Sequence, residues 1–336
     1  MNILVTGGLG YIGSHVVLSL VNNGYKVIII DNLSNCDISV LENLNQLSNS
    51  KLAFEKLDLS VRDQVESFFK NYSNIDGVIH FAALKSVGES VRKPKKYYDN
   101  NLYSMLNIIE FMPKAIPFVF SSSCTVYGSV SNQPITESTP HGIAESPYGK
   151  TKQICEKIMD KEFHGIKDFK GLSLRYFNPL GAHSSGLIGE NPKNTPENLL
   201  PYLTQVVSGK REVLTVYGDD YNTRDGTCIR DYIHIIDLAE AHLKAIEYLF
   251  KIQDKNFIDY INIGTGSGVS VLELIQTFEK STGLKVNYKI GKRRPGDIEV
   301  AYAETKKAEQ ILRWKPKYSL SSALNSAWNW ENKSLD

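Results

Sequence analysis

The segment Asn2-Ile3-Leu4-Val5-Thr6-Gly7-Gly8-Leu9-Gly10-Tyr11-Ile12-Gly13 indicates which fold the chain adopts. Its first five residues form a short apolar run typical of a buried strand, and residues 16–21 continue as an apolar helical pattern. The glycines between them have the spacing G-x-x-G-x-x-G, a variant of the dinucleotide-binding motif. A glycine triplet alone is often only a turn. Because strand, turn and helix occur here in the required order, the segment predicts a site for a pyrophosphate at a helix N-terminus.

A second apolar run, residues 25–30, ends at Asp31. An acid at this position can bind both ribose hydroxyls of NAD and would repel the 2′-phosphate of NADP. Further apolar runs alternate with helical patterns such as residues 97–110, and they predict strands over 52–57, 78–83, 117–120 and 172–178. This alternation predicts an α/β protein with a Rossmann-type doubly wound parallel sheet, which binds ligands at the carboxyl ends of its strands.

The composition changes after residue 178. Residues 179–201 are rich in Pro, Gly, Asn and Ser, and an irregular stretch of this length is usually functional. We therefore predict a dinucleotide-binding domain over residues 1–178 and a smaller α/β C-terminal domain for the substrate over 179–229 and 264–336. Residues 230–263 are expected to return to the first domain.

The stretch Ser146-Pro147-Tyr148-Gly149-Lys150-Thr151-Lys152 reads as a helix start, with Ser146 as cap and Pro147 at the first helical position. Tyr148 and Lys152 would then be i, i+4 neighbours, with Cβ atoms roughly 5–6 Å apart. An adjacent ammonium lowers the pKa of a phenol, so this pair could remove a proton from a hydroxyl near neutral pH. Two other pairs fit the same short pattern, Tyr288/Lys292 and Tyr302/Lys306, and only context can separate the three.

Composition excludes several classes of function. The chain has 336 residues and a net charge of +1, which gives no reason to expect nucleic acid or an anionic membrane as partner. No apolar run approaches the ~20 residues of a membrane helix, and no signal peptide is expected. The four cysteines, at positions 36, 124, 155 and 228, lack metal spacing or a disulfide framework. A reduced cytoplasm is the expected location, and no metal is expected.

Together these residues resemble the extended short-chain dehydrogenase/reductase family, and most closely its UDP-glucose 4-epimerases, over almost the whole chain. Many blocks in the family order carry the resemblance: Thr6–His15, Asp31–Asn35, Val78–Ala82, Lys85–Val91, Tyr97–Asn101, Phe120–Gly128, Ser146–Lys150, Leu174–Pro179 and Arg230–His234. The resemblance identifies Tyr148 and Lys152 as the family's Tyr-Lys pair.

The resemblance also implies roles for residues. Ser123, Tyr148 and Lys152 would be the catalytic set, which also touches NAD. The other residues lining the cofactor would be Gly7, Gly10, Tyr11, Ile12, Gly13, Asp31, Asn32, Leu33, Ser34, Asn35, Cys36, Asp58, Leu59, Phe81, Ala82, Ala83, Lys85, Asn100 and Phe177. The UDP-sugar would contact Lys85, Ser123, Tyr148, Asn178, Asn198, Leu199, Thr215, Val216, Tyr217, Arg230, Arg294, Asp297 and Ala301. The implied activity is epimerisation at C4 by a homodimer, with NAD regenerated in each turnover.

Two other functions compete with this interpretation. Nucleotide-sugar dehydratases of the family carry an Asp-Glu pair where this chain has Cys124-Thr125, and decarboxylases carry Glu at the second position. Elimination of water needs an acid and a base there, which Cys124 and Thr125 do not provide. A catalytically silent NAD-binding scaffold is the second alternative. The retention of Ser123, Tyr148 and Lys152 together argues against it.

One departure concerns the choice of sugar. Family members restricted to glucose and galactose tend to carry Tyr four residues beyond the aspartate of the Arg-Arg-x-Gly-Asp block, and members that also accept N-acetylated sugars carry a small residue. In this chain the aspartate is Asp297 and the residue is Ala301. The resemblance therefore implies turnover of UDP-N-acetylglucosamine and UDP-N-acetylgalactosamine as well, unless Tyr302 fills the space.

Overall fold

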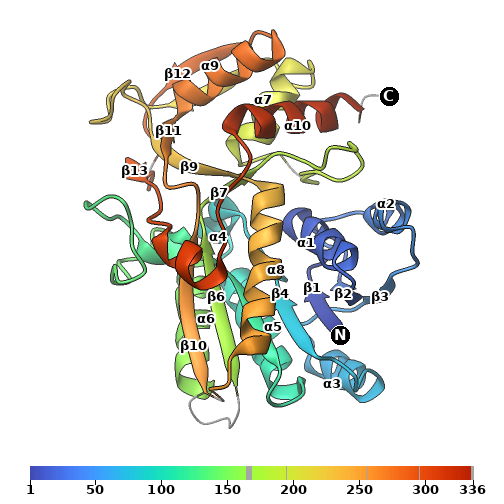
Figure 1. Cartoon of the computed structure of the whole chain (residues 1–336). Helices are drawn as coiled ribbons and strands as arrows, with labels where there is room; N and C mark the ends of the chain where they lie inside the picture. The colour runs from blue at the N-terminus through green and yellow to red at the C-terminus, as the bar shows by residue number, and fades with distance from the viewer. Residues whose placement is uncertain (164–168, 194, 255, 295, 334–336) are drawn as a thin grey trace.

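The computed structural model describes residues 1–163, 169–193, 195–254, 256–294 and 296–333, which form a larger unit with a smaller one above it (Figure 1). The larger unit is built on a seven-stranded sheet of order β10-β6-β5-β4-β1-β2-β3, and every neighbouring pair is parallel. Its strands are β1 (Asn2–Thr6), β2 (Lys26–Asp31), β3 (Ala53–Lys56), β4 (Gly77–His80), β5 (Pro117–Ser123), β6 (Lys170–Tyr176) and β10 (Phe257–Ile263). The predicted Rossmann-type fold is confirmed.

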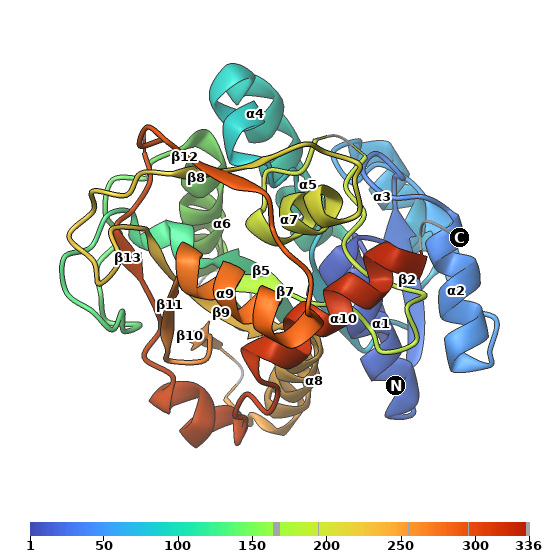
Figure 2. The same ribbon diagram turned by 90° about the horizontal axis from the view of Figure 1, so that it is seen from above.

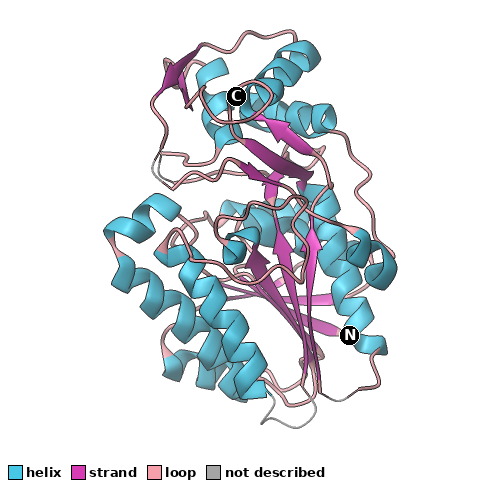
Figure 3. Ribbon diagram, turned by 90° about the vertical axis from the view of Figure 1, so that its left-hand side faces the viewer, coloured by secondary structure: helices cyan, strands magenta, loops and turns pink. Residues whose placement is uncertain are grey.

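Helices cover both faces of this sheet (Figure 3). The residues of β1 are apolar without a break because successive side chains of a strand point to opposite faces of the sheet, and both faces are covered here. Ile3 and Val5 pack into one core, and Leu4 packs into the other. The first core holds α1 (Tyr11–Asn22), α2 (Ser39–Ser48) and α8 (Ile235–Lys251), and the second holds α3 (Arg62–Asn71), α5 (Pro94–Phe111) and α6 (Pro147–Phe163).

The smaller unit has its own core and two small sheets. One sheet has the order β11-β9-β13 with β7 also paired to β9, and the other pairs β12 with β8. Three helices pack on them, and in Figure 2 they lie near the middle of the view. The elements are β7 (Asn178–Leu180), α7 (Leu199–Val207), β8 (Leu214–Tyr217), β9 (Ile229–His234), β11 (Gly268–Ser270), α9 (Val271–Thr282), β12 (Tyr288–Gly291), β13 (Val300–Ala301) and α10 (Leu320–Lys333). Short helices α4 (Val87–Arg92), η1 (Cys124–Tyr127) and η2 (Ala308–Leu312) complete the described chain.

The chain passes between the two units more than once. Strand β6 ends at Tyr176 and the chain enters the small sheet at Asn178, so the smaller unit lies over the carboxyl ends of the large sheet. Strand β9 pairs in the small sheet, and the chain returns to the large one through α8 and β10. The return expected for residues 230–263 therefore begins only at α8, because β9 finds its partners in β7, β11 and β13.

Two element boundaries differ from prediction for local reasons. The helix predicted at residue 97 begins at Pro94, a residue favoured in the first helical turn because its missing N–H is not needed there. Strand β5 extends through the serines to Ser123, because these residues pair in register with β6 up to Tyr176. Ser123 is therefore the last residue of a buried strand.

Candidate active site

The three residues predicted to be catalytic lie together at one end of β5 and α6. Helix α6 begins at Pro147, and the Gly149 N–H donates to Ser146 Oγ at 3.2 Å, so Ser146 acts as a cap. Lys152 Nζ lies 5.9 Å from the centre of the Tyr148 ring and donates to the Ser121 carbonyl oxygen at 2.6 Å. The Ser123 side chain is close enough to the Tyr148 phenol to favour its ionised form.

The charge state of this set differs from the expectation. Burial raises the pKa of the Tyr148 phenol well above its ordinary value, and the neighbouring Ser123 side chain only partly opposes this effect. Burial also lowers the pKa of Lys152 to about 8. The expectation that Lys152 lowers the pKa of Tyr148 is wrong for this structure, because burial dominates and the ammonium is directed at a backbone carbonyl. A further positive charge beside the phenol would favour the phenolate.

The glycine turn after β1 is packed too closely to accept side chains at Gly7 and Gly13. A Cβ on Gly7, where φ is +66°, would lie 2.9 Å from the Ala82 nitrogen, and a Cβ on Gly13 would lie 2.2 Å from the Gly7 oxygen. Helix α1 follows without a side-chain cap and without an acid in its first turn, so its positive end is open to an anion. This turn therefore fits a dinucleotide.

Asp31 lies beside this turn at the end of β2. Its carboxylate accepts hydrogen bonds from the Leu9 N–H at 3.2 Å and the Leu33 N–H at 2.9 Å, which fix it at the strand end. The other residues predicted to line the cofactor follow the ends of the strands or lie on adjacent helices: Gly10, Tyr11 and Ile12 around the start of α1; Asn32, Ser34, Asn35 and Cys36 after β2; Asp58 and Leu59 after β3; Phe81, Ala82, Ala83 and Lys85 after β4; Asn100 on α5; and Phe177 after β6.

Apart from Lys85, Ser123 and Tyr148, the residues predicted to hold the substrate come from the smaller unit. Arg294 donates to both oxygens of Asp297, with Nη2 2.7 Å from Oδ1 and Nε 3.2 Å from Oδ2. Arg230 Nη2 lies 3.8 Å from the same Oδ1, so both arginines converge on one carboxylate. Ala301 on β13 is the register partner of Arg230. Pro295 lies outside the described residues.

The remaining predicted substrate contacts lie on neighbouring elements. Asn178 on β7 pairs with β9, and Asn198 and Leu199 form the start of α7. Thr215, Val216 and Tyr217 lie on β8. Val216 is 1 % exposed and packs in the core of the smaller unit, so only its backbone can meet a ligand.

Comparisons with known proteins agree with this geometry. The UDP-glucose 4-epimerase of Bacillus subtilis (strain 168) is 46% identical over 100% of this chain and 98% of its own length. The chain belongs to the UDP-glucose 4-epimerase family. The family model described as GDP-mannose 4,6 dehydratase also matches, over residues 4–326. The resemblance to extended short-chain dehydrogenase/reductases is thus confirmed.

Solved structures of UDP-glucose 4-epimerases have the same fold. That from Bifidobacterium longum, in complex with NAD+ and UDP, superposes with a TM-score of 0.94, at 44% identity and with 100% of this chain and 99% of that chain covered. The UDP-Glc/GlcNAc 4-epimerase from Campylobacter jejuni superposes with a TM-score of 0.83, at 33% identity and with 99% of each chain covered.

The position that separates UDP-glucose 4-epimerases from dehydratases lies directly after Ser123. Cys124 and Thr125 begin the short helix η1 there. Burial raises the pKa of the Cys124 thiol to about 11, so the thiol stays protonated near neutral pH and cannot act as a base. The side chains at this position do not supply the acid and base of an elimination.

The two decoy Tyr-x-x-x-Lys pairs are not helical neighbours. Tyr288 begins strand β12 and Tyr302 directly follows strand β13. Extended residues rise about 3.3 Å each, so Tyr288 and Lys292 are separated by roughly 13 Å. Tyr302 is outside any helix, and the helical segment that contains Lys306 begins only at that residue. Tyr148 and Lys152 are the pair of the three that lies on one helix.

A buried ion pair below the catalytic set was missing from the sequence predictions. Glu156 Oε1 accepts from Ser122 Oγ at 2.6 Å and from Arg175 Nε at 2.9 Å, and Oε2 accepts from Arg175 Nη2 at 2.8 Å. These bonds join α6, β5 and β6, the elements that carry or flank Tyr148, Lys152 and Ser123. The sequence offered one signal for Glu156: it follows Lys152 by four residues, which places both side chains on the same face of the helix.

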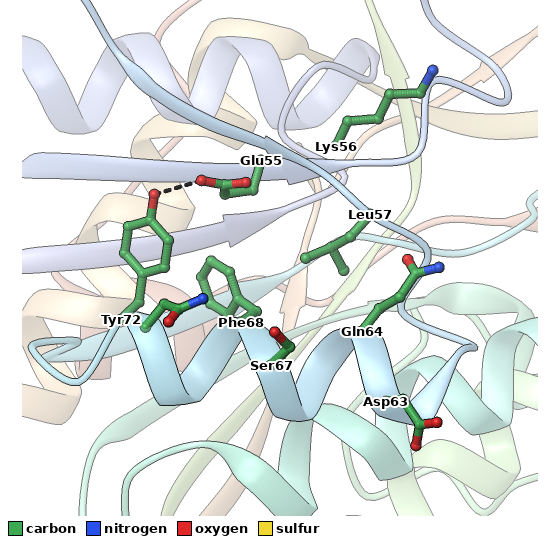
Figure 4. A pocket seen from close by; sticks show the side chains of 9 residues that line it. Glu55, Lys56, Leu57, Asp63, Gln64, Ser67, Phe68 and Tyr72 are labelled. Carbon is green, nitrogen blue, oxygen red and sulfur yellow. Dashed lines mark hydrogen bonds between the residues drawn. The ribbon is translucent and has the colours of Figure 1, made fainter.

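A large hollow lies elsewhere on the molecule. It has a volume of about 480 Å³ and lies between the edge strand β3 and helix α3 (Figure 4). The Tyr72 hydroxyl donates to Glu55 Oε1 at 2.6 Å along its wall. Its lining contains none of the predicted site residues: Glu55, Lys56, Leu57, Asp63, Gln64, Ser67, Phe68, Asn71 and Tyr72. Despite its size, this hollow is not the candidate active site, because no predicted site residue lines it.

No described helix combines the length and the apolar character needed to cross a bilayer. Nor do three or more His, Cys, Asp or Glu side chains of the described residues gather as ligands for a metal ion.

Proposed function

We propose that the chain is an NAD-dependent 4-epimerase that interconverts UDP-glucose and UDP-galactose through a 4-keto sugar. One observation carries this proposal. Ser123, Tyr148 and Lys152 lie together at the carboxyl ends of the strands, where the glycine turn also lies. The B. longum relative was crystallised with NAD+ and UDP, which supports the same ligands here. Asp31 favours NAD over NADP, because a carboxylate repels the additional phosphate.

The residues of the chain have distinct roles in this reaction. When bound, NAD supplies a reversible hydride acceptor with a positively charged ring. Tyr148, as phenolate, removes the proton of the sugar 4-hydroxyl and later returns it, and Ser123 orients both oxygens by hydrogen bonding. Lys152 would hold the nicotinamide ribose, and the positive charge of the bound cofactor would favour the Tyr148 phenolate. Arg230 and Arg294 bind the diphosphate, so the sugar remains free to present its other face.

Turnover by the purified protein tests this proposal directly. We expect the protein to retain NAD through purification and to convert UDP-galactose into UDP-glucose, identified by NMR, without added cofactor. Denaturation should release NAD for identification. Release of NADP would contradict the cofactor assignment. A 4-keto-6-deoxy sugar as product would instead indicate a dehydratase.

We also propose that the enzyme accepts the 2-acetamido sugars, because Ala301 is small at the position where relatives restricted to glucose and galactose tend to carry a tyrosine. Tyr302 does not take this space: its ring lies against Gly268, where an added Cβ would come within 3.2 Å of Tyr302 Cδ1. Ala301 packs instead in the buried cluster with Phe177 and Tyr127. The C. jejuni relative, named a UDP-Glc/GlcNAc 4-epimerase, supports this wider choice of sugar in the family.

Ala301→Tyr should lower kcat/KM for UDP-N-acetylglucosamine by about tenfold or more through steric exclusion, while the value for UDP-glucose stays within about twofold. The ratio of the two values is the measurement. Tyr302→Phe is the matched control and should leave this ratio unchanged. If the wild type does not turn over UDP-N-acetylglucosamine at high enzyme concentration, the argument from pocket size is wrong.

We propose further that the enzyme is a homodimer in the cytoplasm. Helices α4 and α5 expose apolar side chains that a second copy could cover, with Val87 46%, Val91 60%, Tyr103 54% and Leu106 38% exposed. The molar mass from light scattering should be twice that of one chain. All four cysteines are free thiols, which supports a reducing compartment that cell fractionation would identify.

A further inference from the structure

One loop is fastened to both units of the molecule. It joins β7 to α7 and comprises residues 181–193 and 195–198 of the described chain, running between α10 and the helices α1 and α2 (Figures 1 and 2). The Tyr11 hydroxyl of α1 donates to the Gly181 oxygen at 2.6 Å, and Asn43 Nδ2 of α2 donates to the Leu187 oxygen at 2.8 Å. This is the irregular stretch whose length suggested a function, yet the proposed reaction assigns a role only to its last residue, Asn198.

Glu190 is the residue of this loop that contacts both proposed ligand sites. Its Oε1 accepts from Lys85 Nζ at 2.9 Å and from Asn198 Nδ2 at 2.7 Å. Lys85 follows β4 in the larger unit and is proposed to bind cofactor and sugar, whereas Asn198 precedes α7 in the smaller unit and is proposed to bind the substrate. A single carboxylate oxygen therefore connects the segment that follows β4 to the residue that precedes α7.

The backbone at Glu190 is held firmly, which gives its carboxylate a defined position. Trp330 Nε1 on α10 donates to the backbone carbonyl oxygen of Glu190 at 3.2 Å. A Cβ on the preceding residue, Gly189, would lie 2.6 Å from the Trp330 ring, so backbone and indole are in close contact. Ile188 is 1 % exposed in the core. A side chain on such a support can orient its partners.

The partners keep hydrogen-bonding capacity for a ligand. Asn198 is the residue preceding α7, a position where asparagine usually caps the helix, but its side chain makes no cap hydrogen bond and points its amide nitrogen at Glu190. Its second N–H and its carbonyl oxygen stay available. Lys85 has three N–H donors and is 46% exposed, so it can hold Glu190 and still reach an anion.

We propose that Glu190 is a positioning residue that orients Lys85 and Asn198 for binding of the UDP-sugar. This inference rests on the proposed epimerase function and adds a residue that acts through two others without touching the reacting atoms. Because it acts on binding, its loss should change KM and leave the chemical step unchanged. A competing idea, that Glu190 blocks the site as an anion in place of the ligand, predicts the opposite sign.

The test compares Glu190→Gln and Glu190→Ala with the wild type in the purified, NAD-containing protein. We expect KM for UDP-galactose to rise about threefold in Glu190→Gln, which keeps an acceptor, and about tenfold in Glu190→Ala, from the loss of hydrogen bonds to a charged group. The value of kcat should stay within about twofold. Calorimetric titration with UDP alone should show the same order of Kd values.

Glu197→Gln is the matched control. Glu197 lies in the same loop, and its carboxylate accepts from the backbone N–H of Gly88 at 3.3 Å. This variant should leave KM and Kd unchanged. Unchanged or tighter binding of UDP in Glu190→Ala would overturn the proposal, and so would a fall in kcat with KM unchanged. A wild type that binds UDP but does not epimerise would instead refute the function, and the UDP titration would still decide the role of Glu190.

Discussion

Replacement of Tyr148 by phenylalanine is expected to lower kcat by about 10²–10⁴-fold, the usual contribution of a proton-transfer group. The substitution removes only the phenolic oxygen and leaves the ring, whose centre lies 5.9 Å from Lys152 Nζ, in place. The fold and the NAD content should therefore survive. Measurement of kcat with UDP-galactose, together with circular dichroism and the ratio of NAD to protein, separates a chemical defect from a folding defect.

The decoy tyrosines provide the controls for this prediction. Tyr288 is 42% exposed at the start of β12, and Tyr302 lies against Gly268. Neither shares a helix with its lysine, so Tyr288→Phe and Tyr302→Phe should retain nearly full kcat. If Tyr148→Phe turned over at a near-normal rate, the proton would have to leave through another group and the assignment of the base would fall.

The second large effect concerns stability. Glu156→Gln should lower the free energy of unfolding by about 3–5 kcal/mol, because it leaves the guanidinium of Arg175 buried without its counter-ion. Glu156 is fully buried and Arg175 is 4% exposed, so water cannot compensate. Urea unfolding monitored by circular dichroism measures the change. Glu66→Gln removes the partner of Lys70 in an exposed ion pair and should have little effect.

The same pair predicts a dependence on pH. Burial alone would raise the pKa of Glu156, but hydrogen bonds from His141, Arg175 and Ser122 and the charge of Arg175 hold it below its ordinary value of 4.5. A carboxylate whose pKa is depressed by folding contributes its full stability above the ordinary value, and this contribution is lost as the pH falls through the folded-state value. Glu156→Gln should therefore lose less stability than the wild type on acidification. Equal losses in both proteins would show that Glu156 is not the titrating group.

The parts of the fold and of the site that depend on residues close together in the sequence could be predicted. Strand β1, the glycine turn and α1 follow from periodicity and spacing over fewer than 25 residues. Asp31 was predicted because it ends a strand. Tyr148 and Lys152 were candidates because one predicted helix carries both, but the family resemblance was needed to separate them from the two other pairs. Apart from that choice, these conclusions needed only local geometry.

The parts that were not predicted depend on contacts between distant segments. Strand β9 joins the small sheet because its partners lie in β7, β11 and β13, which no local pattern reveals. The bond between Glu156 and Arg175 joins a helix to a strand, and Glu190 lies in a stretch without periodicity. The raised pKa of Tyr148 arises from burial, a property of the folded chain and not of the residues beside it.

The return of the chain through α8 and β10 limits how the protein can be divided. A fragment that ends at residue 178 would lack the edge strand beside β6 and the helix that packs against α1. The fragment would expose the apolar surface of α1 to water and leave β6 as an unprotected edge, which favours aggregation. We therefore expect that residues 1–178 do not fold stably on their own, either as an expressed fragment or as a product of limited proteolysis.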